Sequence, residues 1–372
     1  MNALMTPRTL FRWSLPLLLS FSGLQACSAE TDTPAQNWPT ECVGRMQMRL
    51  PGPADTAAFS FIKMQDYIKR GGYPNGFTFA DGVPAPFAQS IAISHPLTDT
   101  NKEQLKLLLL AEKSEVASRN AVRRKKEGAA APYFGDLPSP PFDRMVTMGW
   151  QFKETVAVRQ FVGDSLLVKS EKLSNASRLA NARPRPIFEV PQEPGLCLPY
   201  IFVPDDGKAQ RGLSMSYRLK DHPDIQITLT DSSAYRPEDS YSNMGEAEIK
   251  HRNKGAEPDP EIADFWGQWL TMARKYESQW RVPDTTRPVT MAGYEGRQSF
   301  VLLTMDDGTK NYGYYAVVRG MPDATEDTPD LRLYVQQDVK QAQGKMPLTK
   351  EQFIEMAQAI AKSVQRRSVS QN

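Results

Sequence analysis

The chain has 372 residues, with 45 Lys or Arg, 43 Asp or Glu and a formal net charge of only +2. This balance argues against nucleic acid as a partner, because binding to phosphates requires a basic excess. About 330 folded residues exceed one comfortable hydrophobic core, so two domains are expected. The 29 prolines favour a loop-rich protein with many strands.

The short basic and apolar N-terminus has the features of a secretory signal. Arg8 and Arg12 precede an apolar stretch over 13–24 that is too short to span a bilayer comfortably. Ala26 stands directly before Cys27, and a leucine lies three residues before that cysteine. The arrangement resembles the bacterial lipobox, in which the cysteine is acylated and becomes the mature N-terminus. An ordinary exported protein with a chance cysteine is the alternative.

We therefore predict a signal peptide over 1–26 and a lipidated tether over 27–40, with acyl chains on Cys27 holding the protein to the membrane. Ser28 after the cysteine resembles the outer-membrane sorting pattern. The expected location is the periplasm, at the inner leaflet of the outer membrane. Removal of the leader takes away two arginines and leaves a formal net charge of zero.

The two remaining cysteines, Cys42 and Cys197, would then lie in an oxidising compartment, where a disulfide between them is expected. Two unpaired cysteines, buried as small apolar residues, are the alternative. A metal site is disfavoured, because neither cysteine has a histidine or a second cysteine at ligand spacing.

The first half of the chain predicts several strands and one long helix. Residues 100–127 form the helix, which Thr100 and Glu103 would cap and in which leucines give one apolar stripe. Its basic end, with four cations over 123–126, is either a solvated helix end or a patch that faces a partner. The predicted strands cover 43–50, 57–68, 90–97, 144–152, 155–163 and 165–173.

The second half predicts strands around two more helices. One helix begins at Asp259 and Pro260 and runs to about Trp280, and the other is capped by Thr349 and Gln352 and is finished by Arg366 and Arg367. An Asp-Gly turn joins two apolar runs into a hairpin. The predicted strands cover 213–219, 224–231, 299–305, 310–318 and 330–337.

These elements predict an α+β fold of two domains, each mainly an antiparallel sheet with one or two packed helices. A segment rich in Pro, Asn and Arg marks the boundary. The expected N-terminal domain covers 41–185, the linker 186–200 and the C-terminal domain 201–372.

The sequence carries no local signature of catalysis. It has no nucleophile elbow, phosphate-binding glycine loop or dinucleotide fingerprint. The three histidines, His95, His222 and His251, lie in turn-like or polar contexts, and Asp306 and Asp307 fit the hairpin turn better than an acid pair. We therefore predict a binding protein with no catalytic residue, no cofactor and no metal site.

Two stretches become specific when they are taken together, "CVGRMQMRLP" at 42–51 and "PGLCLPYIFVPDDG" at 194–207. Three more follow in order, "VTMAGYEGRQSFVLL", "YYAVVRGMPD" and "PDLRLYV". The chain resembles the two-domain immunity proteins that protect bacteria from type VI secretion lipase effectors. The resemblance implies a periplasmic, non-enzymatic protein that binds a cognate phospholipase or lipase toxin one to one and inhibits it.

Two acidic, partly aromatic loops are the predicted partner-binding sites, although ordinary solvated loops would have the same composition. Their candidate residues are Tyr235, Arg236, Glu238, Asp239, Tyr241, Asp323, Glu326 and Asp327. The alternative function is an envelope structural or assembly lipoprotein with a permanent periplasmic partner. A periplasmic hydrolase with a site assembled from distant residues is a third possibility.

Overall fold

A computed structural model describes much of the chain. It covers residues 37–70, 76–86, 91–127, 145–146, 155–172, 179, 181–234, 261–262, 264–267, 279–281, 286–305, 307–322, 324 and 326–369. The predicted leader, Cys27, and the predicted site residues Tyr235, Arg236, Glu238, Asp239, Tyr241 and Asp323 lie outside these ranges, as does His251.

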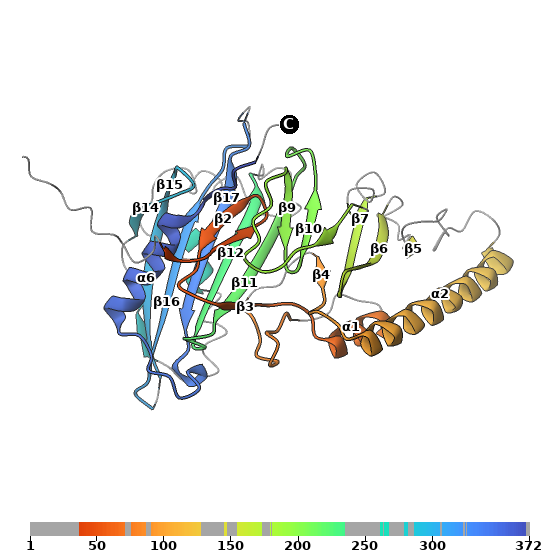
Figure 1. Cartoon of the computed structure of the whole chain (residues 1–372), viewed down its shortest axis with the longest axis horizontal. Helices are drawn as coiled ribbons and strands as arrows, with labels where there is room; N and C mark the ends of the chain where they lie inside the picture. The colour runs from red at the N-terminus through yellow and green to blue at the C-terminus, as the bar shows by residue number, and fades with distance from the viewer. Residues whose placement is uncertain are drawn as a thin grey trace, which may run out of the picture.

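An eight-stranded antiparallel sheet forms the larger part of the molecule, which we call the large lobe (Figure 1). The strand order is β13-β15-β16-β17-β12-β11-β3, and β14 also pairs with β15. The strands are β3 (Ala54–Thr56), β11 (Gly212–Leu219), β12 (Ile225–Ser233), β13 (Gln279–Arg281), β14 (Arg287–Met291), β15 (Tyr294–Thr304), β16 (Lys310–Val318) and β17 (Pro329–Gln337).

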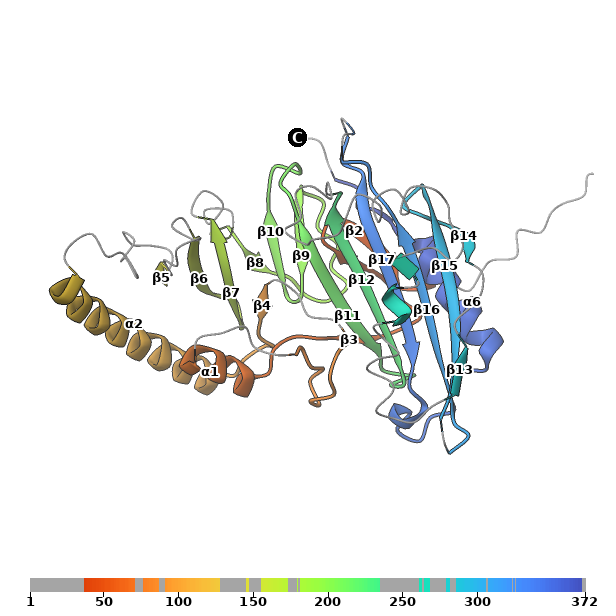
Figure 2. The ribbon, with the colours of Figure 1, turned by 180° about the vertical axis from the view of Figure 1, so that it is seen from behind.

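Alternation along these strands gives the sheet two distinct faces. One face carries Ile227, Leu229, Leu333 and similar side chains, which pack against α6 (Lys350–Ser363) in the main core. The other face carries Tyr315 and Tyr334, which pack with Trp266 and Ile262 from the helical residues 261–262 and 264–267. Figure 2 shows these helical residues on the face turned away from α6.

Two small sheets lie beside the large one. The first has the order β1-β2-β18 and joins both ends of the described chain, and the second has the order β8-β10-β9. Their strands are β1 (Thr40–Val43), β2 (Met46–Arg49), β8 (Arg183–Pro184), β9 (Gly195–Leu198), β10 (Ile201–Pro204) and β18 (Gln365–Arg366).

The small lobe contains a four-stranded sheet of order β4-β7-β6-β5 and two helices. Its strands are β4 (Ala92–Ile93), β5 (Met145–Val146), β6 (Thr155–Val162) and β7 (Ser165–Lys172), and its helices are α1 (Phe61–Arg70) and α2 (Asp99–Glu127). Its separate core includes Phe59, Met64, Leu105 and Leu166. In Figure 1, α2 extends well beyond this core.

The two cores draw on the chain in different ways. The main core takes residues from 43–54 and 198–364, and it also includes Leu179 and side chains on or beside the small-lobe strands, namely Ile91, Ile93, Val158, Val162 and Leu167. The small-lobe core takes residues from 57–168. Arg218 on β11 joins the lobes, because it donates to Asp81 at 2.8 Å and lies over the ring of Phe79. The predicted domain limits of 41–185, 186–200 and 201–372 remain a prediction.

Most predicted elements are confirmed. The α+β class is correct, the long helix spans 99–127, and β15 and β16 form the predicted hairpin. The capping box of α6 is present, since Thr349 and Gln352 bond to each other's backbone amides. Among the described helices, none is both long and apolar enough to cross a membrane.

Several details of the prediction are wrong. The predicted strand over 43–50 is instead a hairpin, in which β1 pairs with β2 across a turn at Gly44 and Arg45. Thr100 lies inside the long helix and does not cap it, because the hydroxyl of Thr98 accepts from the amide of Asn101.

Residues 61–70 form a helix rather than a strand. The hydroxyl of Ser60 accepts from the amide of Lys63 at the start of this helix, and the side chains of Met64 and Ile68 are buried one turn apart. Gln279–Arg281 pairs with β15, so the predicted helix ends before Trp280. The last helix ends at Ser363, and the chain then pairs with β2.

Candidate partner-binding surface

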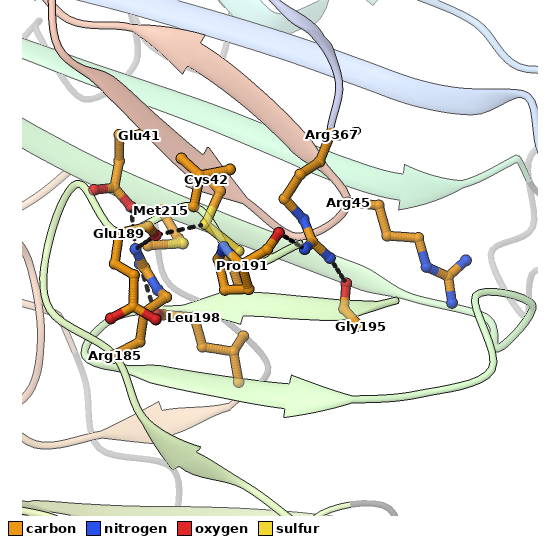
Figure 3. The surroundings of a disulfide bond; sticks show 12 residues. Glu41, Cys42, Arg45, Arg185, Glu189, Pro191, Gly195, Leu198, Met215 and Arg367 are labelled. Atoms are coloured by element: carbon orange, nitrogen blue, oxygen red, sulfur yellow. Dashed lines mark hydrogen bonds and ion pairs between the residues drawn. A yellow bond between two sulfur atoms is a disulfide. The ribbon is translucent and has the colours of Figure 1, made fainter. Parts of the chain in front are cut away.

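A disulfide joins two segments, β1 and β9, that meet beside the large sheet (Figure 3). Cys42 on β1 and Cys197 on β9 are bonded across a sequence separation of 155 residues, and both are fully buried with Phe202. Gly44 exchanges two backbone hydrogen bonds of 2.9 Å with Cys197. We call this region, with Glu41, Arg185 and Arg367, the disulfide knot.

A buried ion pair flanks the disulfide. The guanidinium of Arg185 lies 2.7 Å from Glu41, and neither side chain is accessible to solvent. Arg185 also donates to the carbonyls of Glu189 and Leu198, and Glu41 accepts from the amide of Phe188. These partners fix the local geometry but only partly offset the desolvation, because burial raises the pKa of Glu41 in spite of Arg185 and the amide of Phe188.

Arg367 fixes the C-terminal segment to the same knot. Its guanidinium donates to the carbonyls of Glu193 at 2.8 Å and Gly195 at 2.7 Å, and it lies 5.1 Å from the centre of the Phe202 ring. Burial lowers the pKa of Arg367 to about 10. The end of the chain is therefore part of the fold of the large lobe.

A second buried ion network continues from the knot. Asp231 on β12 accepts from the Nε of Arg211 at 2.7 Å and from the backbone amide of Arg45 at 2.8 Å. The side chains of Asp231 and Arg211 have 0% exposure. Burial alone would lower the pKa of Arg211, but the carboxylates of Asp231 and Asp327 raise it.

Asp327 connects this network to the loop between β16 and β17. Its carboxylate lies 2.9 Å from Arg211, 3.1 Å from Arg366 and 3.6 Å from Arg45, and its side chain is 26% exposed. Burial alone would raise the pKa of Asp327, but the hydrogen bonds and charges of Arg211 and Arg366 lower it. Asp327 is therefore ionised and held in place at neutral pH.

The described residues of the 320–328 loop are fixed at both ends. The hydroxyl of Thr328 accepts from the amide of Met321 at 2.7 Å and donates to its carbonyl at 2.9 Å. The amide of Gly320 donates to Asp330 at 2.7 Å. Met321 is nevertheless 63% exposed, and Glu326 is exposed as well. Met321 therefore presents a large apolar side chain from a backbone position that is held by hydrogen bonds.

The predicted site residues fall into three groups. Cys42 and Cys197 are bonded inside the knot. Glu326 is exposed on the 320–328 loop, whereas Asp327 is directed into the arginine network. The remaining candidates lie outside the described residues. Sequence reasoning did not single out Met321 or Arg211, although a charged residue inside the alternating strand 224–231 was a signal that Asp231 has a buried partner.

Of the two described histidines, His95 and His222, the first has structural surroundings. His95 contacts the carbonyl of Thr78 at 2.8 Å and the hydroxyl of Tyr200 at 3.3 Å, and burial lowers its pKa. Asp307 accepts from the amide of Thr309 in the hairpin turn. Within the described ranges, no three His, Cys, Asp or Glu side chains gather closely enough to hold a metal ion.

One family model matches part of the chain. Residues 189–252, which begin at the disulfide knot and include β9 to β12, match the model of the Tle cognate immunity protein 4 C-terminal domain. This match confirms the resemblance of the chain to immunity proteins of type VI secretion lipase effectors. No curated protein matches the chain.

Solved structures of low sequence identity are also similar. One is described as the Tle4–Tli4 complex, with 14% identity, a TM-score of 0.49 and coverage of 90% of this chain and 99% of the other. Another is the immunity protein TplEi of the type VI secretion system from Pseudomonas aeruginosa, complexed with an "L" peptide. It has 13% identity, a TM-score of 0.49 and coverage of 90% and 100%. The apo structure of TplEi has 14% identity, a TM-score of 0.46 and coverage of 90% and 98%.

Proposed function

We propose that this chain is a periplasmic immunity lipoprotein that binds and inhibits a cognate type VI secretion phospholipase or lipase toxin and so protects the producing cell. The observation that carries the proposal is the match of residues 189–252 to the immunity protein family. The signal-like N-terminus and the buried disulfide agree with it, because both suit an exported protein.

The proposal includes four finer points. Cys27 carries the acyl chains that hold the protein to the inner leaflet of the outer membrane. The chain acts by covering the effector and not by catalysis. It binds one effector molecule and uses the domains 41–185 and 201–372, joined by the linker 186–200.

The function is tested with a soluble chain of residues 28–372 and the lipase effector encoded nearest its gene. Phospholipid hydrolysis is measured against the molar ratio of the two proteins. We expect the rate to fall to zero near one to one. Undiminished hydrolysis at excess chain, with no co-elution of the two proteins, would remove the proposal and favour the envelope-partner alternative.

We further propose that the effector contacts the 320–328 loop. Binding costs less conformational entropy when a contact loop is already ordered, and Asp327 and Thr328 order this one. The exposed Met321 has the size and adaptability of an interface anchor, and Glu326 provides a charge at its edge. Asp327 acts as a positioning residue. The second predicted loop, with Tyr235, Arg236, Glu238, Asp239 and Tyr241, remains a candidate together with Asp323.

The loop assignment is tested by Met321→Asp with Met346→Asp as the matched control. Met346 is 85% exposed and follows η4 (Val339–Gln341), which comes after β17, whereas the 320–328 loop comes before β17. We expect M321D to weaken inhibition about tenfold or more, because an interface hot spot contributes about 2 kcal/mol or more and about 1.4 kcal/mol is a factor of ten. M346D should leave inhibition unchanged. Equal inhibition by both variants and the parent would reject the loop while leaving the function intact.

A further inference from the structure

The long helix α2 has one exposed face that the function above does not use. Leu107, Leu110 and Val122 on this face are 66%, 59% and 53% exposed. The opposite face buries Leu105 and Leu109 in the small-lobe core. At 100° per residue, the exposed face continues through Ala111, Ser114, Ser118 and Ala121, all of which are exposed.

The central strip of this face, within about 60° of Ser114, is free of charge from Leu107 to Ala121 and has a charge at each end. Val122 lies at the edge of the strip, next to Glu115 in helical position. Glu103 lies on the strip before Leu107, and Lys125 lies on it after Val122, both exposed. Its large side chains, Leu107 and Leu110, are in the N-terminal half, and the small Ser118 and Ala121 are in the C-terminal half. The N-terminal half of the face therefore carries the large side chains and the negative charge, and the C-terminal half carries the small side chains and the positive charge.

Such a face is complementary to itself in an antiparallel pair centred on Ser114. Residues at equal distances before and after the centre then lie opposite each other. The facing pairs are Glu103 with Lys125, Leu107 with Ala121 and Leu110 with Ser118. This register places Leu107 and Leu110 each against a small side chain and places Glu103, which also pairs with Lys106 of its own helix at 2.6 Å, against Lys125. Val122, at the edge of the face, lies opposite Lys106. The face spans about 33 Å between Glu103 and Lys125.

We propose that the α2 face of one molecule packs antiparallel against the α2 face of a second copy, with the two-fold axis at Ser114. A two-fold contact uses the same surface on both partners, as this register requires. The opposite charges at its ends favour a second copy over an unrelated occupant. A single pair of helices buries less than the roughly 1,200 Å² of stable interfaces, so the dimer is weak, with a Kd in the micromolar range or above.

The register has a direct test by crosslinking the chain of residues 28–372. Ser114→Cys places two thiols at the two-fold axis, so oxidation should give a covalent dimer. Ala121→Cys is the matched control, because Ala121 would face Leu107 and not its own copy. Covalent dimer from S114C and little from A121C is the expected result. Equal yields from both variants, or no dimer from S114C, would overturn the proposal.

A charge swap tests the ends of the same face by sedimentation equilibrium up to about 1 mM chain. Glu103→Lys and Lys125→Glu should each raise the dimer Kd about tenfold by placing like charges opposite each other. The double variant should restore the parent Kd, which a general loss of fold would not. A purely monomeric parent would overturn the proposal. If the parent is monomeric, Leu107→Glu shows what the face binds instead. Loss of effector inhibition in this variant would assign the face to the effector, and loss of vesicle binding would assign it to the membrane.

Discussion

The strongest single prediction concerns Asp231, at the centre of the buried ion network. The substitution Asp231→Asn keeps the size of the side chain and removes its charge. Asp231 is fully buried, bonds to Arg211 through both carboxylate oxygens at 2.7 Å, and accepts from the amide of Arg45 at 2.8 Å. The variant therefore changes the electrostatics of the network with little change in packing.

The expected cost follows from these partners. Removal of one member of a buried ion pair costs about 3–5 kcal/mol, because the other charge remains buried. The amide oxygen of Asn can still accept from Arg45, and Arg211 retains Asp327 at 2.9 Å. Both residual contacts place the expected loss at the lower end, about 3 kcal/mol of unfolding free energy.

The loss is measured by urea unfolding followed by tryptophan fluorescence, with the slope of the transition as a check that the same structure unfolds. Two matched variants grade the effect by burial. Asp327→Asn, at 26% exposure, should cost about 1 kcal/mol, and the exposed Glu326→Gln nearly nothing. If D231N is no more destabilising than E326Q, the buried ion network does not stabilise the large lobe.

Three further predictions concern the same frame. Replacement of Cys42 and Cys197 by Ser should lower the unfolding free energy by up to about 5 kcal/mol, because the bond closes a loop of 155 residues; thermal unfolding with and without reductant checks this. Arg367→Met should cost about 2 kcal/mol or more, since it leaves the carbonyls of Glu193 and Gly195 without their donor; urea unfolding measures it. The lowered pKa of Asp327 contributes stability that is present above the ordinary value of 3.8 and is lost as pH falls below it. The urea midpoint of unfolding should therefore decrease as the pH is lowered through this range, and it should decrease less for D327N than for the parent.

Local signals in the sequence predicted the elements whose periodicity is complete within one segment. The helix 99–127 and the hairpin of β15 and β16 are of this kind. The failure at 57–68 has a local cause. Ala58 and Phe59 do make β-bridges, but Ser60 then caps a helix in which Met64 and Ile68 are the buried residues among the described side chains. A short segment with both periods cannot be assigned from its pattern alone.

The candidate surface was less predictable, because its order comes from contacts between distant residues. Asp327 belongs to an acidic loop and was expected to face a partner, but its position depends on Arg211, 116 residues before it. Arg367 was expected to finish a helix, but carbonyls at 193 and 195 hold it in the knot. No spacing within one segment encodes such pairs, whereas a buried acid in an alternating strand can at least indicate that a basic partner exists.

The arrangement also explains why an inhibitory scaffold would contain so many buried charges. A binding loop is useful only if its exposed anchor stays in one place, and the free energy for this must come from elsewhere in the fold. Here Arg211 and Arg366 hold Asp327, while Arg211 is held by Asp231 and Arg366 by the pairing of β18 with β2. Because β2 belongs to the hairpin that the disulfide fixes, the order of the 320–328 loop depends on both ends of the chain. Substitutions far from Met321 that loosen this frame should therefore weaken binding through loop order rather than through lost contacts.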